Sequence, residues 1–149
     1  MRIVDRVRDF ARRHHLFGPA TRVVVALSGG SDSVALAHIM AGFGTSGEVC
    51  LAGIAHFNHQ LRETAARDEQ CAAAVAASLG VPIEVDRGDV AGRARCERRS
   101  IEDAARRSRY EFFERARRRF DADAVALGHT RDDQAETVLL RLIRGAGPR

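Results

Sequence analysis

A short apolar segment followed at once by a turn of small residues constrains the fold more than any other feature of this chain. Residues Arg22–Leu27 are mostly β-branched and apolar, which predicts a strand buried on both faces. Residues 28–31 form a tight Ser/Gly turn, and a helix is expected from about Ser33 to Ala41. A buried strand that turns directly into a helix is typical of an α/β protein with a parallel sheet.

The rest of the chain repeats this alternation. Gly80 is placed to end one of the helices, and Ser100 has the spacing of a capping residue at the start of another. The pattern predicts one doubly wound, mostly parallel sheet with helices on both faces, and ligands beyond the carboxyl ends of its strands. The expected helices are 3–15, 64–79, 101–119 and 132–144, the other expected strands are 49–55, 81–85 and 124–127, and 56–63 is expected to be a polar loop.

The basic residues are all arginine, 24 of them, and there is no lysine. A Walker A site and Schiff-base chemistry are therefore excluded, because both need a lysine amine. The formal net charge of +4, with eleven arginines against five acids between residues 91 and 120, favours an anionic partner such as nucleic acid or a nucleotide. The alternative is a solvated, charged helix face.

Cys50, Cys71 and Cys96 are far apart in the sequence and form no C-x-x-C pair. This spacing argues against a disulfide framework, a zinc knuckle or an iron–sulfur cluster, and it suits the reducing cytoplasm. The longest apolar run, Val23 to Leu27, is too short to span a bilayer, so no membrane association is expected.

The turn at residues 28–33 combines glycines, hydroxyls and a carboxylate where a parallel strand ends. Glycines let the backbone approach a ligand, and the helix behind them points free N–H groups and its positive dipole end into the turn. Such a site suits a polyphosphate, with Asp32 needing a cation such as Mg²⁺ beside it. The alternative is a strand-to-helix turn whose Ser and Asp only cap the helix. The predicted nucleotide-binding residues are Ser28, Gly29, Gly30, Ser31, Asp32 and Ser33.

Polar residues also follow the second and fourth predicted strands. The segment His56-Phe57-Asn58-His59-Gln60-Leu61-Arg62 is either a loop with local hydrogen bonds or, through its two histidines, half of a metal site. His129 follows strand 124–127 and could act as a general base. Asp133 could bind a metal or an ammonium group, whereas acids here could also simply cap the helix.

The Arg-rich helix carries Arg106, Arg109 and Phe113 on one face. Two guanidiniums there could meet phosphate while the aromatic ring packs inward. A charged surface face is again the alternative.

Residues 28–33 resemble the PP-loop motif S-G-G-x-D-S of the ATP pyrophosphatase family, whose members cleave ATP between the α and β phosphates. With the H-F-N-H-x-L-R and A-R-x-x-R-Y-x-F-F segments in this order, the chain from about Arg22 resembles the catalytic domain of the tRNA(Ile)-lysidine synthase family. The resemblance predicts that residues 1–149 form a PP-loop ATP-binding catalytic domain, without its C-terminal end and the tRNA-binding domains.

The resemblance implies a cytoplasmic ligase that uses ATP and Mg²⁺, with isoleucine tRNA and free lysine as partners. The wobble cytidine is adenylated on O2 of its C2 carbonyl, releasing pyrophosphate, and the ε-amine of lysine then attacks C2 and expels AMP. The resemblance is compatible with a homodimer. The implied roles are metal binding for Asp32, phosphate contacts for Arg109 and more weakly Arg106, positioning of the amine for His129 and Asp133, and substrate contacts for His56, His59 and Arg62.

Three other functions fit parts of the pattern. A 2-thiocytidine-type tRNA thiolase resembles the chain in the PP-loop and in H-x-x-D-D-x-x-E-T, but such relatives hold a cluster with a cysteine pair that this sequence lacks. A non-catalytic ATP-binding module would use the same turn without turnover. A metallohydrolase would need His56, His59, His129 and Asp133 to converge on one metal.

Overall fold

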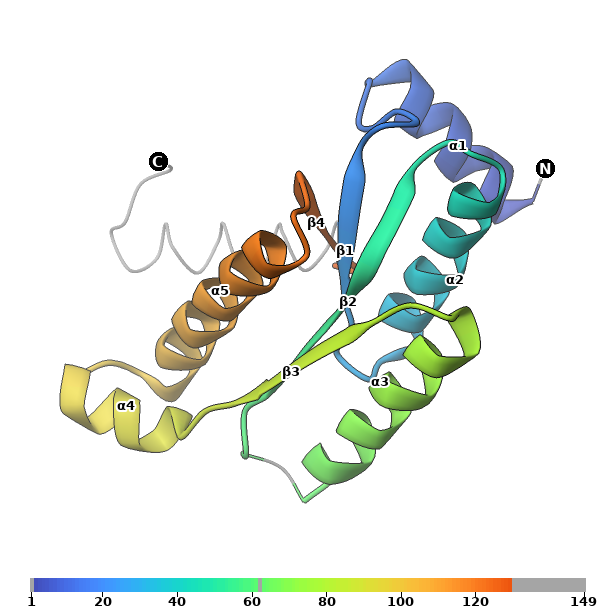
Figure 1. Ribbon diagram of the computed structural model, residues 1–149. Helices are drawn as coiled ribbons and strands as arrows, with labels where there is room; N and C mark the ends of the chain where they lie inside the picture. The colour runs from blue at the N-terminus through green and yellow to red at the C-terminus, as the bar shows by residue number, and fades with distance from the viewer. Residues whose placement is uncertain (1, 62, 130–149) are drawn as a thin grey trace.

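The structure, a computed structural model, describes residues 2–61 and 63–129. Within these residues four parallel strands form one sheet in the order β3-β2-β1-β4, and five helices cover it (Figure 1). The predicted α/β fold with a parallel sheet is confirmed. The strands are β1 (Arg22–Ala26), β2 (Cys50–Asn58), β3 (Ile83–Arg87) and β4 (Ala124–Leu127), and the helices are α1 (Ile3–Arg13), α2 (Ser31–Thr45), α3 (Ala65–Leu79), α4 (Val90–Glu97) and α5 (Ile101–Arg119).

Strand β1 is buried on both faces because successive strand residues point to opposite sides of a sheet. Val24 packs in a core with Phe112 and other residues of α4 and α5. Val23 and Val25 pack in a second core with Phe43, to which α1, α2 and α3 contribute. Figure 1 shows the same division, with α5 on one side of the sheet and α2 and α3 on the other. The prediction of helices on both faces is therefore confirmed.

The direction in which successive strands are added to the sheet reverses at β1. The chain moves from β1 to β2 and β3 on one side, and then returns through α4 and α5 to place β4 on the other side of β1. In such sheets a crevice opens beyond the carboxyl ends of the two strands on either side of the reversal. The turn after β1 and the residues after β4 meet at this position.

Two helix-boundary predictions are confirmed by their caps. Ser100 is the N-cap of α5, and its hydroxyl accepts a hydrogen bond from the backbone N–H of Asp103 at 3.1 Å. Gly80 ends α3 in the left-handed conformation, with φ of +66°. The cap at Ser100 positions the helix that carries Arg109.

Two elements are longer than predicted. Helix α2 continues through two glycines to Thr45 instead of ending at Ala41, because it buries Phe43 completely and this gain exceeds the cost of about 1 kcal/mol for each helical glycine. Strand β2 continues to Asn58, so His56 lies in the sheet and not in a polar loop. The predicted start of the loop at residue 56 was wrong, because pairing of residues 56–58 with β3 overrides their polar character, whereas residues 59–61 lie outside the strand as predicted.

Helix α4 was not predicted, although Asp89 caps it by accepting a hydrogen bond from the N–H of Gly92 at 2.8 Å. Strand β3 begins at Ile83, two residues later than expected. The predicted helix 132–144 lies outside the described residues. No helix within residues 2–61 and 63–129 is long and apolar enough to cross a membrane.

Candidate functional site

The side chain of Ser33 closes the turn after β1 from within. Its hydroxyl donates to the carbonyl of Gly30 at 2.9 Å and accepts from the backbone N–H of Ser28 at 3.1 Å. Gly29 turns the chain at φ of +90°, where any other residue would be strained. The hydroxyl proton of Ser33 is thus used inside the turn, and a contact between this residue and nucleotide stays a prediction.

The first turn of α2 begins where this loop ends. Gly30 is its N-cap, and no side chain caps the helix. The first intrahelical hydrogen bond runs from the N–H of Val34 to the carbonyl of Gly30, so the N–H groups of Ser31, Asp32 and Ser33 have no intrahelical acceptor. These N–H groups and the positive end of the helix dipole form an arrangement that binds phosphate.

Asp32 is the carboxylate of this turn. Its side chain is exposed and accepts one hydrogen bond within the described residues, from the hydroxyl of Ser31 at 3.4 Å. Mg²⁺ usually takes one or two carboxylates together with phosphate oxygens and water. Within the described part of the chain, no three His, Cys, Asp or Glu side chains form a group that could hold a metal ion. An ion shared between Asp32 and a polyphosphate therefore fits this site.

Two glycines let neighbouring elements approach the turn closely. A Cβ atom on Gly29 would lie 2.9 Å from the side chain of Asp68, in the first turn of α3. A Cβ atom on Gly128, which follows β4, would lie 2.9 Å from the Cα of Ser33. The turn is thus enclosed by segments far apart in the sequence. Sequence reasoning missed Asp68, because no motif distinguishes it from the other charged residues of α3.

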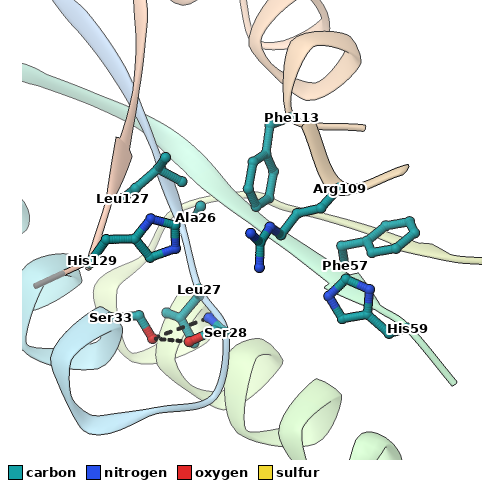
Figure 2. A pocket seen from close by; sticks show the side chains of 11 residues that line it. Ala26, Leu27, Ser28, Ser33, Phe57, His59, Arg109, Phe113, Leu127 and His129 are labelled. Atoms are coloured by element: carbon teal, nitrogen blue, oxygen red, sulfur yellow. Dashed lines mark hydrogen bonds between the residues drawn. The ribbon is translucent and has the colours of Figure 1, made fainter. Parts of the chain in front are cut away.

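Arg109 supplies positive charge beside the turn. Its side chain reaches from α5 towards Ser28 and His129 (Figure 2). No carboxylate pairs with it within the described residues, and its buried Nε atom has no hydrogen-bond partner there. Burial lowers the pKa of the Arg109 guanidinium, but arginine remains protonated in proteins. A half-buried, uncompensated cation favours an anionic ligand.

Two hollows open beside the turn, and Arg109 lies between them. The smaller hollow, of about 80 Å³, lies between the ends of β1 and β4 and is also lined by Ser33 and His129 (Figure 2). The larger hollow, of about 330 Å³, lies at the end of β2 and is also lined by His56 and Asp68. The residues that line both are Ser28, Phe57, His59 and Arg109.

His56 is a buried hydrogen-bond acceptor beside the larger hollow. It is 2% exposed, and its Nδ1 atom lies 2.7 Å from the carbonyl oxygen of Leu27. A carbonyl only accepts, so Nδ1 carries the proton and Nε2 is left as an acceptor. Nε2 has no hydrogen-bond partner within the described residues. An N–H or O–H group of a ligand would match it.

A polar cluster fixes the end of β2. Asn58 donates to the carboxylate of Glu69 at 3.1 Å, and the backbone N–H of Gln60 donates to the side-chain oxygen of Asn58 at 2.9 Å. Arg87, at the end of β3, donates to both oxygens of Glu69. Hydrogen bonds from Arg87 and then Asn58 lower the pKa of Glu69 to about 2. This cluster orients the segment that carries His59.

The remaining predicted site residues differ from one another in their positions. His59 lines both hollows, with its ring edge-on to Phe57 at 4.8 Å. Arg106 lines neither hollow and lies over the ring of Tyr110. Arg62 and Asp133 lie outside the described residues, so the structure does not place them.

A glycine turn with helix N–H groups directed into it, at the reversal point of a parallel sheet, is typical of nucleotide-binding α/β domains. A family model described as a PP-loop domain matches residues 4–149. The chain belongs to the PP-loop family.

Curated relatives show which proteins this chain resembles in sequence. The chain is 46% identical over 148 residues to the tRNA(Ile)-lysidine synthase of Geobacter sulfurreducens, a match that covers 97% of this chain and 31% of the relative. It is 40% identical to the tRNA(Ile)-lysidine synthase of Symbiobacterium thermophilum over 99% of this chain and 30% of that protein. The chain thus spans about a third of the length of these relatives.

Among solved structures, the chain resembles the U34-tRNA thiolase of Methanococcus maripaludis determined with its [4Fe-4S] cluster. The TM-score is 0.71, and the match covers 95% of this chain and 48% of the thiolase. At 19% sequence identity this likeness supports the fold alone.

Proposed function

We propose that this chain is the ATP-using catalytic domain of a tRNA(Ile)-lysidine synthase, an ATP-dependent carbon–nitrogen ligase. The names of the relatives in two bacteria support this proposal. The structural observation that carries it is the cation of Arg109, which has no carboxylate partner among the described residues, beside a glycine turn whose helix N–H groups have no intrahelical acceptor. That pair of features suits a polyphosphate.

ATP binding follows from the charges around the turn. The triphosphate would accept hydrogen bonds from the N–H groups at the start of α2, with Arg109 on its other side. Mg²⁺, held by Asp32 and phosphate oxygens, would neutralise the remaining negative charge. The free acceptor on His56 suits an amine or hydroxyl of a bound substrate in the larger hollow.

The proposed reaction has two steps. O2 of the wobble cytidine attacks the α phosphorus of ATP, and pyrophosphate leaves. The ε-amine of lysine then attacks C2, AMP leaves with the former O2, and the amine loses a proton to give lysidine. The first step is needed because a ring carbonyl oxygen is a poor leaving group, whereas AMP leaves readily.

We assign His129 a role in the second step. It lines the smaller hollow together with Arg109, so a base and a phosphate-binding cation lie on the same cavity. We assign it the proton of the attacking amine. We keep the roles that the resemblance implies for four further residues. Positioning of the lysine amine is assigned to Asp133, and contacts with the substrate are assigned to His56, His59 and Arg62. The three cysteines are free, which fits the proposed cytoplasmic location, and a homodimer stays a prediction.

Calorimetric titration with Mg·ATP tests the nucleotide site in this chain. Arg109→Gln should weaken ATP binding about 10- to 100-fold, because a charge-assisted contact with phosphate is lost. Asp32→Ala should abolish Mg²⁺-dependent ATP use while the fold stays intact. Arg118→Gln is the matched control, since this exposed arginine of α5 pairs with Glu114 at 2.9 Å.

The Arg109→Gln variant should be as stable as the wild type or more so, because it removes a half-buried cation that no carboxylate of the described residues compensates. Unchanged ATP affinity in a folded Arg109→Gln protein would contradict the proposed site.

The reaction is tested by incubating isoleucine tRNA with the chain, labelled ATP and lysine. Lysidine detected by mass in the tRNA, with AMP formed only when tRNA and lysine are both present, would support the proposal. ATP bound without AMP under any condition would instead favour a non-catalytic nucleotide-binding module.

A further inference from the structure

Two arginines of α5 differ from the other arginines of this helix because they form no ion pair with an acid of the part of the chain that the structure describes. Seven of the eleven arginines between residues 91 and 120 form ion pairs with carboxylates within the described residues. Arg106 and Arg109 do not, although acidic side chains lie elsewhere on the same helix. An arginine pair without an acidic partner among the described residues, on a helix where the other arginines are paired, favours an external anion.

The two free guanidiniums flank the single tyrosine of the chain. The Cζ atoms of Arg106 and Arg109 lie 5.6 and 5.8 Å from the centre of the Tyr110 ring. Tyr110 is 39% exposed. The exposed part of this residue therefore lies beside two positive charges.

Tyr110 sits at the rim of the candidate active site. Its ring packs edge-to-face on Phe113 at a centroid distance of 6.3 Å, and Phe113 lines the smaller hollow. Arg109, on its other side, lines both hollows. A molecule in contact with the Tyr110 ring would thus be adjacent to whatever occupies the cavity.

We propose that Tyr110, with Arg106 and Arg109, is a stacking platform for a nucleobase of the RNA substrate, next to the base that enters the cavity. Bases of unpaired RNA stack on aromatic rings and guanidinium planes, and arginines neutralise the adjoining phosphates. The rim of the candidate active site provides one aromatic ring and two guanidinium groups together. The identity of the RNA rests on the proposed function, whereas the platform rests on the geometry of α5.

The platform would offset a free-energy cost of the proposed reaction. A base that enters a cavity leaves the stack of its neighbours, at a cost of a few kcal/mol. The neighbouring base then exposes one face, and the Tyr110 ring can cover it. Arg106, which lines neither hollow, accordingly serves the RNA backbone and not the ATP phosphates.

The test is the affinity for a hairpin RNA that carries the anticodon loop of isoleucine tRNA. Tyr110→Ala should weaken binding about 5- to 100-fold, as expected for the loss of one base stack. Tyr110→Phe keeps the ring and should bind within about 2-fold of the wild type. Arg106→Gln should reduce the slope of log affinity against log salt by about 0.7, the value for one phosphate contact on a single strand, while Tyr110→Ala leaves that slope unchanged.

A fluorescent base locates the contact. With 2-aminopurine placed in turn on each side of the target cytidine, one position should be quenched by the wild type and by Tyr110→Phe, but not by Tyr110→Ala. Affinity for Mg·ATP should be unchanged in all three proteins.

The outcomes separate the platform from the proposed function. Lysidine formation by a Tyr110→Ala protein that binds the hairpin like the wild type would overturn the platform and leave the function standing. A Tyr110-dependent affinity that is equal for unrelated hairpins would leave the platform and count against isoleucine tRNA as the substrate. Absence of RNA binding by the folded wild type would overturn the platform.

Discussion

At the scale of single residues, the candidate site depends on two glycines that serve different purposes. Gly29 has a positive φ and also lies against Asp68, whereas Gly128 has an ordinary backbone and lies against the main chain of Ser33. The sequence motif marks Gly29 through the turn it belongs to. It gives no indication that a side chain from α3 occupies the space beside it.

Gly29→Ala should therefore be costlier than an alanine at another left-handed glycine. Gly47 is the matched control, because it has φ of +72° and nothing within 4 Å of a Cβ. We expect a loss of about 1 kcal/mol in the free energy of unfolding for Gly47→Ala, from backbone strain alone. For Gly29→Ala we expect about 2–3 kcal/mol, and Asp68→Ala in the same chain should restore about 1 kcal/mol of it. Denaturant unfolding of these three variants and the wild type measures this, and equal losses at both glycines would contradict the close contact.

At the scale of elements, one carboxylate connects three of them beneath the larger hollow. Glu69 of α3 bonds Asn58 at the end of β2 and Arg87 at the end of β3. The contact keeps the ends of two strands in register with a helix. Because the folded protein holds the pKa of Glu69 near 2, below its ordinary value of 4.5, the ionised form stabilises the fold.

Glu69→Gln should lower the free energy of unfolding by about 1 kcal/mol at pH 7, since Gln can still accept from Asn58 and the Arg87 partner is largely exposed. The wild-type advantage is complete above about pH 5, and it should shrink as the pH falls from 4.5 through 2, because both states bind the proton only below the folded-state pKa of about 2. Urea midpoints across this range provide the measurement. The control Glu63→Gln changes an exposed carboxylate and should show little difference from the wild type at any pH. A Glu69→Gln deficit that persists undiminished at pH 2 would contradict the charge-based role.

At the scale of the whole molecule, the sheet joins two cores into one unit. Phe43 lies in the core under α2 and Phe112 in the core under α5, each at most 1% exposed. Strand β1 contributes residues to both cores. Opening either layer therefore exposes residues of a strand that also packs in the other core. The two layers should therefore unfold together.

Phe43→Ala should destabilise the protein by about 3–5 kcal/mol. The chain has one tyrosine and no tryptophan, so Tyr110 fluorescence reports on the α5 layer, opposite Phe43. The fluorescence midpoint should move as far as the midpoint of helical circular dichroism. Phe10→Ala, at a 56% exposed position, is the control and should change stability by less than about 0.5 kcal/mol. Separate midpoints for the two signals would show that the layers unfold independently.

The sequence alone determined the repeating elements and the chemistry of the turn. A buried apolar strand, a Ser/Gly turn and a capped helix are local patterns, because each depends on residues within a few positions of one another. For this reason β1, the caps at Gly80 and Ser100 and the turn that joins β1 to α2 could be predicted, whereas anion binding by residues 28–33 stays a prediction. Helix α4, with only a single capping residue as its signal, was missed.

Only the tertiary structure decided which distant residues meet. Arg109 and Arg106 are three positions apart on one helix. Arg109 nevertheless lies between the two hollows, whereas Arg106 lies over the ring of Tyr110. His56 became a buried acceptor because β2 extends beside β3, and Asp68 joined the turn because α3 packs against it. These outcomes depend on the strand order and on the packing of helices across the sheet, which no local pattern specifies.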